Sequence, residues 1–327
     1  MRTSGARRRR AATVIASVVL LAFAAHGAAW FIACRRLEQG AADAVIQARA
    51  EGWAVSSGAP RRAGWPLAAE IDYPDLVVAG GPESFPPELT WRAEALRLRL
   101  SLAAPATLVV EPAGRQTLQA AGLPALPFSA RRMALSLPLT SGAPPTAAID
   151  ALTASVGGGA LTVHDAALTF PARAASAELH GIGLPAGAPP IDLFRADAAM
   201  TRPVPPGATP AERARAWRDA GGSVALSNAA LRWGKLEASG SGTLGLDDQL
   251  QPRAEGTIEA TGLPAALDEL ARSGALPPAA ATAAKAVVAI LAAPAPGAPV
   301  RLPIELRDGR LAVAHFPLLR FPLLEWE

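Results

Sequence analysis

The sequence predicts a mainly β protein, in which an N-terminal transmembrane helix precedes an antiparallel β-rich body with a few short helices. Three observations predict it. An uncharged apolar run lies near the N-terminus, alternating apolar and polar residues recur through the body, and proline- and glycine-rich links separate these stretches at short intervals. Alternation with period two is typical of half-buried strands, and frequent short links are typical of all-β architectures.

The apolar run covers residues 11–34, which read AATVIASVVLLAFAAHGAAWFIAC. About 20 apolar residues span the hydrocarbon layer of a bilayer as a helix. Five arginines precede the run and two follow it. Because positive charge stays on the cytoplasmic side, we expect residues 1–10 to be a cytoplasmic tail, residues 11–34 an inner-membrane anchor and residues 35–327 a periplasmic body. The residues expected to mark the anchor are Ala11, Leu20, Leu21, Trp30 and Cys34.

Two other interpretations of this segment compete with a retained anchor. Ala22-Phe23-Ala24 resembles the A-x-A site of a cleaved signal peptide. Phe31 to Cys34 resembles a lipobox, although Phe31 stands where leucine is usual. An anchor is favoured because the apolar run is longer than the about 7–15 residues of a signal peptide's apolar region. From the sequence alone, cleavage stays open.

The charge distribution argues against a nucleic-acid partner. The net charge is +3, but seven arginines and no acidic residue fall within the first 36 residues, which leaves 24 basic and 28 acidic residues for the rest of the chain. The excess positive charge is therefore part of the topology signal. Cys34 is the only cysteine, so the body has neither a disulfide framework nor a cysteine-based zinc site.

The clearest strand signal lies at residues 91–102, which read WRAEALRLRLSL. Leucines fall on one side of this stretch, and Arg97 and Arg99 fall on the other. A second alternating stretch ends near Pro138, which predicts a sheet edge or a strand end there. The two stretches define a candidate apolar face, formed by Leu96, Leu98, Leu100, Leu102, Leu135, Leu137 and Leu139. Periodicity leaves open whether this face closes a core or lines an open groove.

Further strands and several helices are expected along the body. The other expected strands are 53–57, 107–111, 147–155, 160–164, 175–180, 191–199, 223–233, 235–246, 252–261, 300–307 and 310–315. A short helix is expected at 35–52, another at 210–220 within a proline-rich excursion over 201–222, and a helical stretch over 263–292. Asp308-Gly309 predicts a tight hairpin turn, because both positions tolerate positive φ.

Two stretches of the chain resemble the DUF2125 family of uncharacterised bacterial envelope proteins. Gly64-Trp65-Pro66-Leu67 is similar to the G-[FW]-P strand entry near the start of that family, and residues 224–271 with 302–318 resemble its C-terminal part. The order of anchor, GWP strand, β-rich middle, glycine-containing repeat, helices and DG hairpin extends the resemblance over nearly the whole chain. It implies an architecture and an envelope location, but no reaction. The repeat also resembles AsmA-like envelope proteins, which are linked to lipid handling; this is an analogy of fold.

The sequence contains no catalytic signature. His164, His180 and His315 are far apart and lack metal-ligand spacing, and no G-x-S-x-G motif occurs. The glycines at 157–159 lack the lysine and hydroxyl residue of a P-loop and predict a hairpin turn instead. We therefore expect a protein that is not an enzyme and holds neither a cofactor nor a metal.

The expected function is that of a non-enzymatic, membrane-anchored periplasmic protein that binds lipid or assists envelope assembly. The alternative is a scaffold or partner-binding subunit of an inner-membrane complex. An open groove lined by leucine would favour lipid, a closed core would favour the scaffold, and a pocket that gathers histidines and acids would favour an enzyme. The expected partners are the membrane, lipid or another envelope protein, and not nucleic acid.

Overall fold

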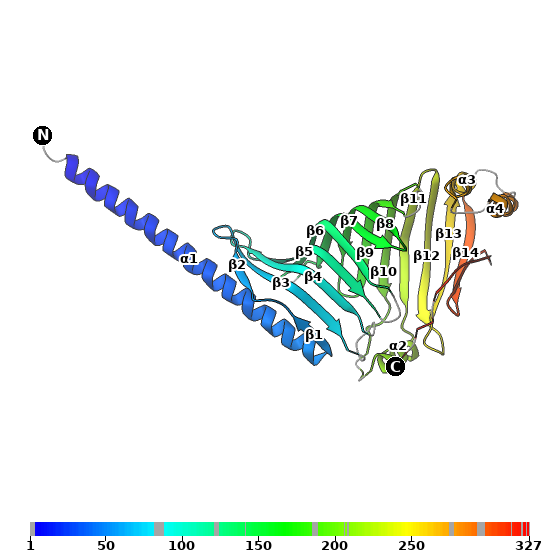
Figure 1. The fold of residues 1–327 in the computed structure, drawn as a ribbon, viewed down its shortest axis with the longest axis horizontal. Helices are drawn as coiled ribbons and strands as arrows, with labels where there is room; N and C mark the ends of the chain where they lie inside the picture. The colour runs from blue at the N-terminus through cyan, green and yellow to red at the C-terminus, as the bar shows by residue number, and fades with distance from the viewer. Residues whose placement is uncertain are drawn as a thin grey trace.

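The computed structural model describes residues 4–327 apart from 82–87, 121–123, 141, 185–188, 206, 208, 275–277, 293–297, 315, 322, 325 and 327. A long N-terminal helix, α1 (Ser4–Ala50), is attached along its second half to one large antiparallel sheet (Figure 1). The arrangement confirms the predicted fold class of a long apolar helix followed by a mainly antiparallel β body.

The sheet is a meander. Sixteen strands of the described chain belong to it, and from β4 onward every strand pairs with the strand that precedes it in the sequence, while β1 and β2 both pair with β3. The bounds are β1 Trp53–Ser56, β2 Arg61–Ala63, β3 Ala68–Gly80, β4 Thr90–Ser101, β5 Thr107–Gln119, β6 Leu126–Pro138, β7 Thr146–Val156, β8 Gly159–Thr169, β9 Ala174–Gly183, β10 Ile191–Met200, β11 Val224–Trp233, β12 Leu236–Leu246, β13 Pro252–Thr261, β14 Val300–Arg307, β15 Arg310–Val313 and β16 Phe316–Arg320.

The helix expected at 35–52 is present up to Ala50, and it continues the helix of the apolar run before it, so that both belong to α1. It is one continuous helix of 47 residues, which makes it about 70 Å long. The charged pair Arg35-Arg36 does not interrupt it, because arginine is a good helix former. The part that is long and apolar enough to cross a membrane and the part that contacts the sheet therefore belong to one continuous helix.

Several strands are longer than the alternation predicted, because bulges shift the pattern without ending the pairing. In β5 the register shifts between Val110 and Gln116, and Gly114 has φ 76. The expected strand stopped at residue 111, just before this bulge. Pro138 ends β6 opposite Thr107, inside the sheet, so its predicted place at a strand end is confirmed. The strands β2 and β16 were not expected from the sequence.

One side of the sheet is apolar along nearly its whole width. Register partners on neighbouring strands share a face, and two unbroken rows of such partners are apolar. From β3 to β10 the first row is Ile71, Leu98, Val110, Leu135, Ala147, Leu168, Ala177 and Ala196. From β6 to β14 the second row is Met133, Ile149, Ala166, Leu179, Phe194, Leu231, Ala238, Ala260 and Val300. We call the surface that carries these rows the apolar face.

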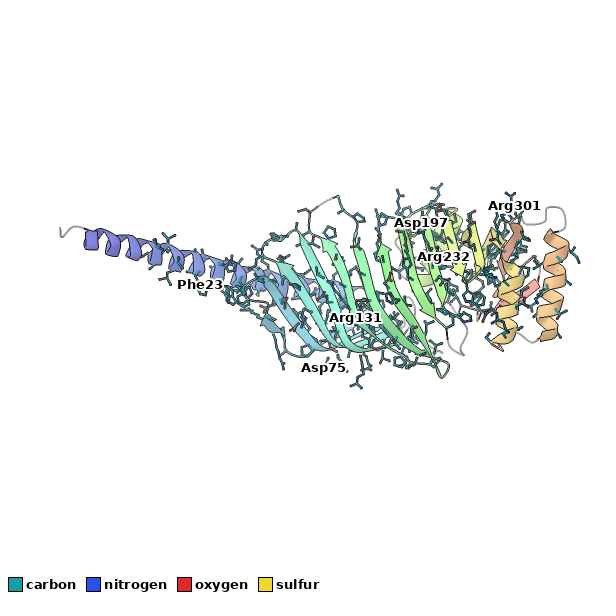
Figure 2. All side chains as sticks on the ribbon, turned by 90° about the horizontal axis from the view of Figure 1, so that it is seen from above. Phe23, Asp75, Arg131, Asp197, Arg232 and Arg301 are labelled. Atoms are coloured by element: carbon teal, nitrogen blue, oxygen red, sulfur yellow. The ribbon has the colours of Figure 1, made fainter. Side chains whose placement is uncertain are left out.

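The opposite side, which we call the charged face, carries ion pairs between strands. The pairs include Asp72–Arg97, Glu111–Arg132, Asp150–Arg131, Glu178–Arg195 and Glu259–Arg301. Figure 2 shows Arg131, Arg232 and Arg301 at successive positions along this sheet. Most of these side chains are exposed, so each pair contributes little to stability on its own. These pairs place charged side chains on one face of the sheet, while the rows on the other face are apolar.

The sheet curls toward its apolar face. Trp53 in β1 and Leu246 at the end of β12 line the same cavity of about 820 Å³, together with Trp217 of α2 (Pro210–Asp219). Nine strands separate β1 from β12 in the sheet, and in a flat sheet ten spacings would place them about 48 Å apart. Helix α1 packs on the apolar face of β3, so the curl encloses that face rather than the charged one.

The remaining helices lie at the margins of the sheet. The main sheet contacts of the described helices are α1 with β1 and β3, α2 and α3 (Leu263–Arg272) with β12, and α4 (Pro278–Ala292) with β14. Figure 1 shows α2 below the converging strand ends and α3 and α4 beside β13 and β14. The middle of the apolar face thus has no helical layer among the described residues.

The accessible surface reflects this open construction. The chain exposes 20368 Å², whereas a compact monomer of 33.4 kDa would expose about 12,600 Å². The excess comes from a free helix and from a sheet that is not packed against a second sheet. Of the two possibilities that periodicity left open, the packing of the described residues resembles an open surface more than a closed core over the middle strands.

Candidate functional site

The structure brings five of the seven predicted leucines together on the apolar face. Their register partners are also apolar: Leu96 lies opposite Tyr73, Leu98 opposite Ile71, Leu100 and Leu137 opposite Leu108, and Leu135 opposite Val110. Leu98 is 8% exposed and the others are half-buried. These residues form the end of the face that lies nearest α1.

The other two predicted leucines lie just beyond the strands. The amide of Leu102 donates to Leu67 O at 3.1 Å, and the amide of Leu139 donates to Ala106 O at 2.8 Å. The side chain of Leu139 is 55% exposed. Both residues therefore belong to the loops at one end of the strands and extend the apolar surface there.

Helix α1 covers the first strands of the apolar face. Cys34 and Leu37 are buried against Ala69 and Ile71 of β3. The indole Nε1 of Trp30 donates to Ala68 O at 2.9 Å and fixes the helix to the start of that strand. In the described part of the chain α1 makes no comparable contact beyond β5, so this helix covers only one end of the face.

The predicted anchor residues divide into two groups along α1. Leu20 and Leu21 are exposed, and the helix from residue 15 onward is long and apolar enough to cross a membrane. Ala11 lies in the helix, and its side chain falls outside the described residues. Trp30 and Cys34 instead contact β3. The anchor and the docking segment therefore overlap by about one turn of helix.

An ion pair joins α1 to β2 on the outer side of this contact. The guanidinium of Arg62 donates to both carboxylate oxygens of Glu38, at 2.8 and 2.6 Å. The hydrogen bond from Arg62 is the main reason why the pKa of Glu38 lies below its usual value. The Arg62 guanidinium also lies 4.9 Å from the ring centroid of Phe31, so one arginine holds two turns of the helix.

A shallow hollow interrupts the apolar face between β10 and β14. It encloses about 290 Å³, and Phe194, Leu226, Leu231, Ile258 and Ile304 are among the side chains that line it. Its floor is formed by three glycines, Gly240, Gly242 and Gly256. A Cβ at Gly240 would lie 2.7 Å from Thr257 O, so a side chain there would collide with the next strand.

Sequence reasoning did not identify this second half of the face. The alternation of β10 to β13 is present, but alanine, glycine and serine occupy many of its positions. Small residues give a weak hydropathy signal, although they create the hollow. Phe194 and Leu226, which are 38% and 36% exposed, could have been found as isolated large apolar residues among small ones.

The histidines named by the sequence analysis lie on the charged face or outside the described residues. His180 of β9 pairs in register with Asp165 of β8. His164 Nδ1 lies 2.9 Å from Asp165, and His180 Nε2 lies 3.0 Å from Glu178. His164 is exposed and the other three residues are half-buried, and the described residues contain no group of three that could hold a metal. His315 is outside the described residues.

The fold and this geometry can be compared with known proteins. A family described as "Uncharacterized protein conserved in bacteria (DUF2125)" matches residues 30–322. The chain belongs to the DUF2125 family. The match to DUF2125 begins at Trp30, where α1 first bonds to β3, and continues through the whole sheet. The shared part of DUF2125 is therefore the sheet together with its docking segment. Neither a curated protein nor a solved structure matches this DUF2125 chain.

Proposed function

We propose that this protein is a non-enzymatic, inner-membrane-anchored periplasmic protein that holds lipid acyl chains on the apolar face. One observation carries the proposal: the second apolar row crosses nine strands without a polar residue. Soluble domains rarely leave a large contiguous apolar surface uncovered unless it receives a ligand or partner. An acyl chain needs only such a surface, with no specific polar group.

The dimensions of the face support this ligand. The last two residues of the second row, Ala260 and Val300, are buried, so the accessible part runs from β6 to β12, which is six strand spacings or about 29 Å. One layer of acyl chains takes up half of the hydrocarbon core of a bilayer, which is about 30 Å thick, so this length accommodates one extended chain. Each methylene group removed from water on the face contributes about 0.8 kcal/mol. A fully seated chain would therefore bind strongly without a headgroup contact.

The position of the face relative to the anchor supports a membrane source for the lipid. Helix α1 leaves the membrane and runs directly onto β3, where the apolar rows begin. The arginine asymmetry around residues 11–34 favours a body on the periplasmic side. A lipid that leaves the outer surface of the inner membrane would meet the apolar face within a short distance.

Site-specific photocrosslinking in cells tests the proposal on the full chain. A photoreactive benzoyl-phenylalanine replaces Phe194 or Leu231 on the apolar face, and Arg195 or Arg232 on the charged face as matched controls. The cells are labelled with radioactive phosphate, irradiated, and the purified protein is analysed by gel and autoradiography. Radioactive phospholipid should be attached at Phe194 and Leu231, and not at Arg195 or Arg232.

Other outcomes of the same experiment would contradict lipid binding. Equal labelling from both faces would indicate random contact with the membrane. A discrete crosslinked protein band at Phe194 and Leu231, without radioactive lipid, would favour the scaffold function that the sequence left as the alternative. Mass spectrometry of the crosslinked peptide distinguishes these products.

A further inference from the structure

We propose that the turn between β2 and β3, residues 64–67, inserts into the bilayer leaflet on the side of the sheet and forms a second membrane contact beside α1. The turn carries the sequence Gly-Trp-Pro-Leu. The ligand of this surface is the bilayer itself. The inference rests on the proposed membrane anchor, but it does not depend on whether the apolar face binds lipid.

The length of α1 sets the depth of the turn. Arg10 is the last charged residue before the apolar run, and Arg35 is the next one after it. A helix rises about 1.5 Å per residue, so the twenty residues that follow Arg10 cross about 30 Å and reach Trp30. The level of Trp30 is therefore the boundary of the hydrocarbon layer on the side of the sheet.

Trp65 contacts α1 on the hydrocarbon side of that level. Its ring centroid lies 5.6 Å from that of Phe23, 5.1 Å from that of His26 and 5.8 Å from that of Trp30, all with edge-to-face geometry. Phe23 is seven residues before Trp30, which corresponds to about 10 Å along the helix axis. Figure 2 shows Phe23 where the free part of α1 meets the sheet. The turn thus shares its depth with the last two turns of the spanning segment.

The exposed side chains of the turn are apolar. Leu67 is 76% exposed and Trp65 is 40% exposed. On the neighbouring helix surface, Phe31 and Ile32 are exposed as well. Tryptophan is enriched at membrane interfaces, where its amphipathic ring lies at the headgroup level. In water these side chains would form an unfavourable cluster, whereas in a leaflet they face hydrocarbon.

The backbone of the turn has hydrogen-bond partners that suit an apolar environment. His26 Nε2 lies 2.7 Å from Pro66 O, and Trp30 Nε1 donates to Ala68 O. The amides of Leu67 and Ala68 both donate to Gly64 O, at 3.1 and 2.9 Å. A carbonyl without a partner costs several kcal/mol within a bilayer. His26, a polar residue inside the apolar run, thereby gains a role as a partner for the turn.

Basic residues border the turn at the level expected for lipid phosphates. The guanidinium groups of Arg35 and Arg62 lie 6.0 and 4.9 Å from the ring centroid of Phe31. Arg61, beside Arg62 at the start of β2, is exposed. Arginine at a span end places its charge among the headgroups while its stem remains in the apolar layer. Going outward from the middle of the bilayer, the apolar turn comes before the arginines, just as the hydrocarbon layer of a leaflet comes before its headgroups.

Spin-label accessibility measures the depth of the turn in the full-length protein. In a Cys34→Ala background, single cysteines at Leu67, Val19 and Val156 receive a nitroxide label, and the protein is reconstituted in phosphatidylethanolamine–phosphatidylglycerol vesicles. Val19 is an exposed residue of the spanning helix, and Val156 is an exposed residue at the opposite end of the strands. Oxygen partitions into the bilayer, whereas a nickel chelate remains in water.

The proposal predicts that the label at Leu67 resembles the label at Val19. Both should be relaxed by oxygen and protected from the nickel chelate, while the label at Val156 should show the reverse. A label at Leu67 that is as accessible to nickel as the one at Val156 would overturn the proposal. Protection from both reagents would overturn it too, because it would show that protein covers the turn. Unchanged circular dichroism confirms that each variant is folded.

Discussion

Leu98 and Arg97 are neighbours in β4 that face opposite sides of the sheet: Leu98 is buried beside Ile71, and Arg97 reaches Asp72 at 2.8 Å. Leu98→Asp should therefore destabilise the protein by about 3 kcal/mol or more, because it buries an unpaired carboxylate. Arg97→Gln removes the ion pairs of Arg97 with Asp72 and, at 4.0 Å, with Glu70; because the arginine is exposed to solvent, the loss should cost no more than about 1 kcal/mol. Thermal unfolding of the two purified variants measures the difference. Equal melting temperatures would show that the face assignment is wrong.

The topology predicts that residues after α1 are periplasmic. An alkaline phosphatase domain fused after Glu51, just beyond the end of α1, should be active, because this enzyme needs the periplasm to form its disulfides. The fusion should also remain in the membrane fraction at full length. An inactive fusion would reverse the orientation, and a soluble product that begins near Ala25 would show that the segment is a cleaved signal.

The hollow between β10 and β14 offers a way to block the apolar face. Ala254→Trp places a large ring next to the hollow, where Ala254 is part of the wall. We expect it to lower phospholipid crosslinking from Phe194 severalfold while the protein stays folded. Arg253→Trp adds the same ring one residue away, on the charged face, and should leave crosslinking unchanged. If both variants crosslink as the parent does, the hollow is not part of the lipid path.

The Glu38–Arg62 pair should make the docking of α1 depend on pH. Because the pair lowers the pKa of Glu38 below its ordinary 4.5, its stabilising effect is present at neutral pH. It is lost only as the pH falls through the lowered pKa of the folded state. Glu38→Gln should therefore melt slightly below the parent at pH 7, and the gap should close in acid. A gap that is constant down to pH 3 would mean that the pair does not contribute through its charge.

Local sequence signals predicted most of the elements. The alternation of residues 91–102 indicated β4, and Asp308-Gly309 indicated the last hairpin, where both residues have positive φ. Pro278 and the prolines after residue 292 gave the bounds of α4. In each case the signal and the structure involve the same few neighbouring residues, so no knowledge of distant partners was needed.

The continuity of the apolar face was not predictable in this way. Whether Phe194 shares a face with Leu231 depends on the register between β10 and β11, and the bulge between Arg195 and Asp197 shifts that register along the strand pair. The curl that brings Trp53 near Leu246 depends on the summed twist of ten spacings. The periodicity of residues within one strand gives neither the register between strands nor the summed twist of the sheet.

The meander order of the sheet makes its length an adjustable property. Because each strand from β4 onward pairs with its predecessor in the chain, inserting one more hairpin would interrupt only the pairing at the insertion point and would leave all the others in place. Two added strands would extend the apolar rows by about 10 Å. The length of the apolar face could thus evolve by duplication of hairpins, without a new fold.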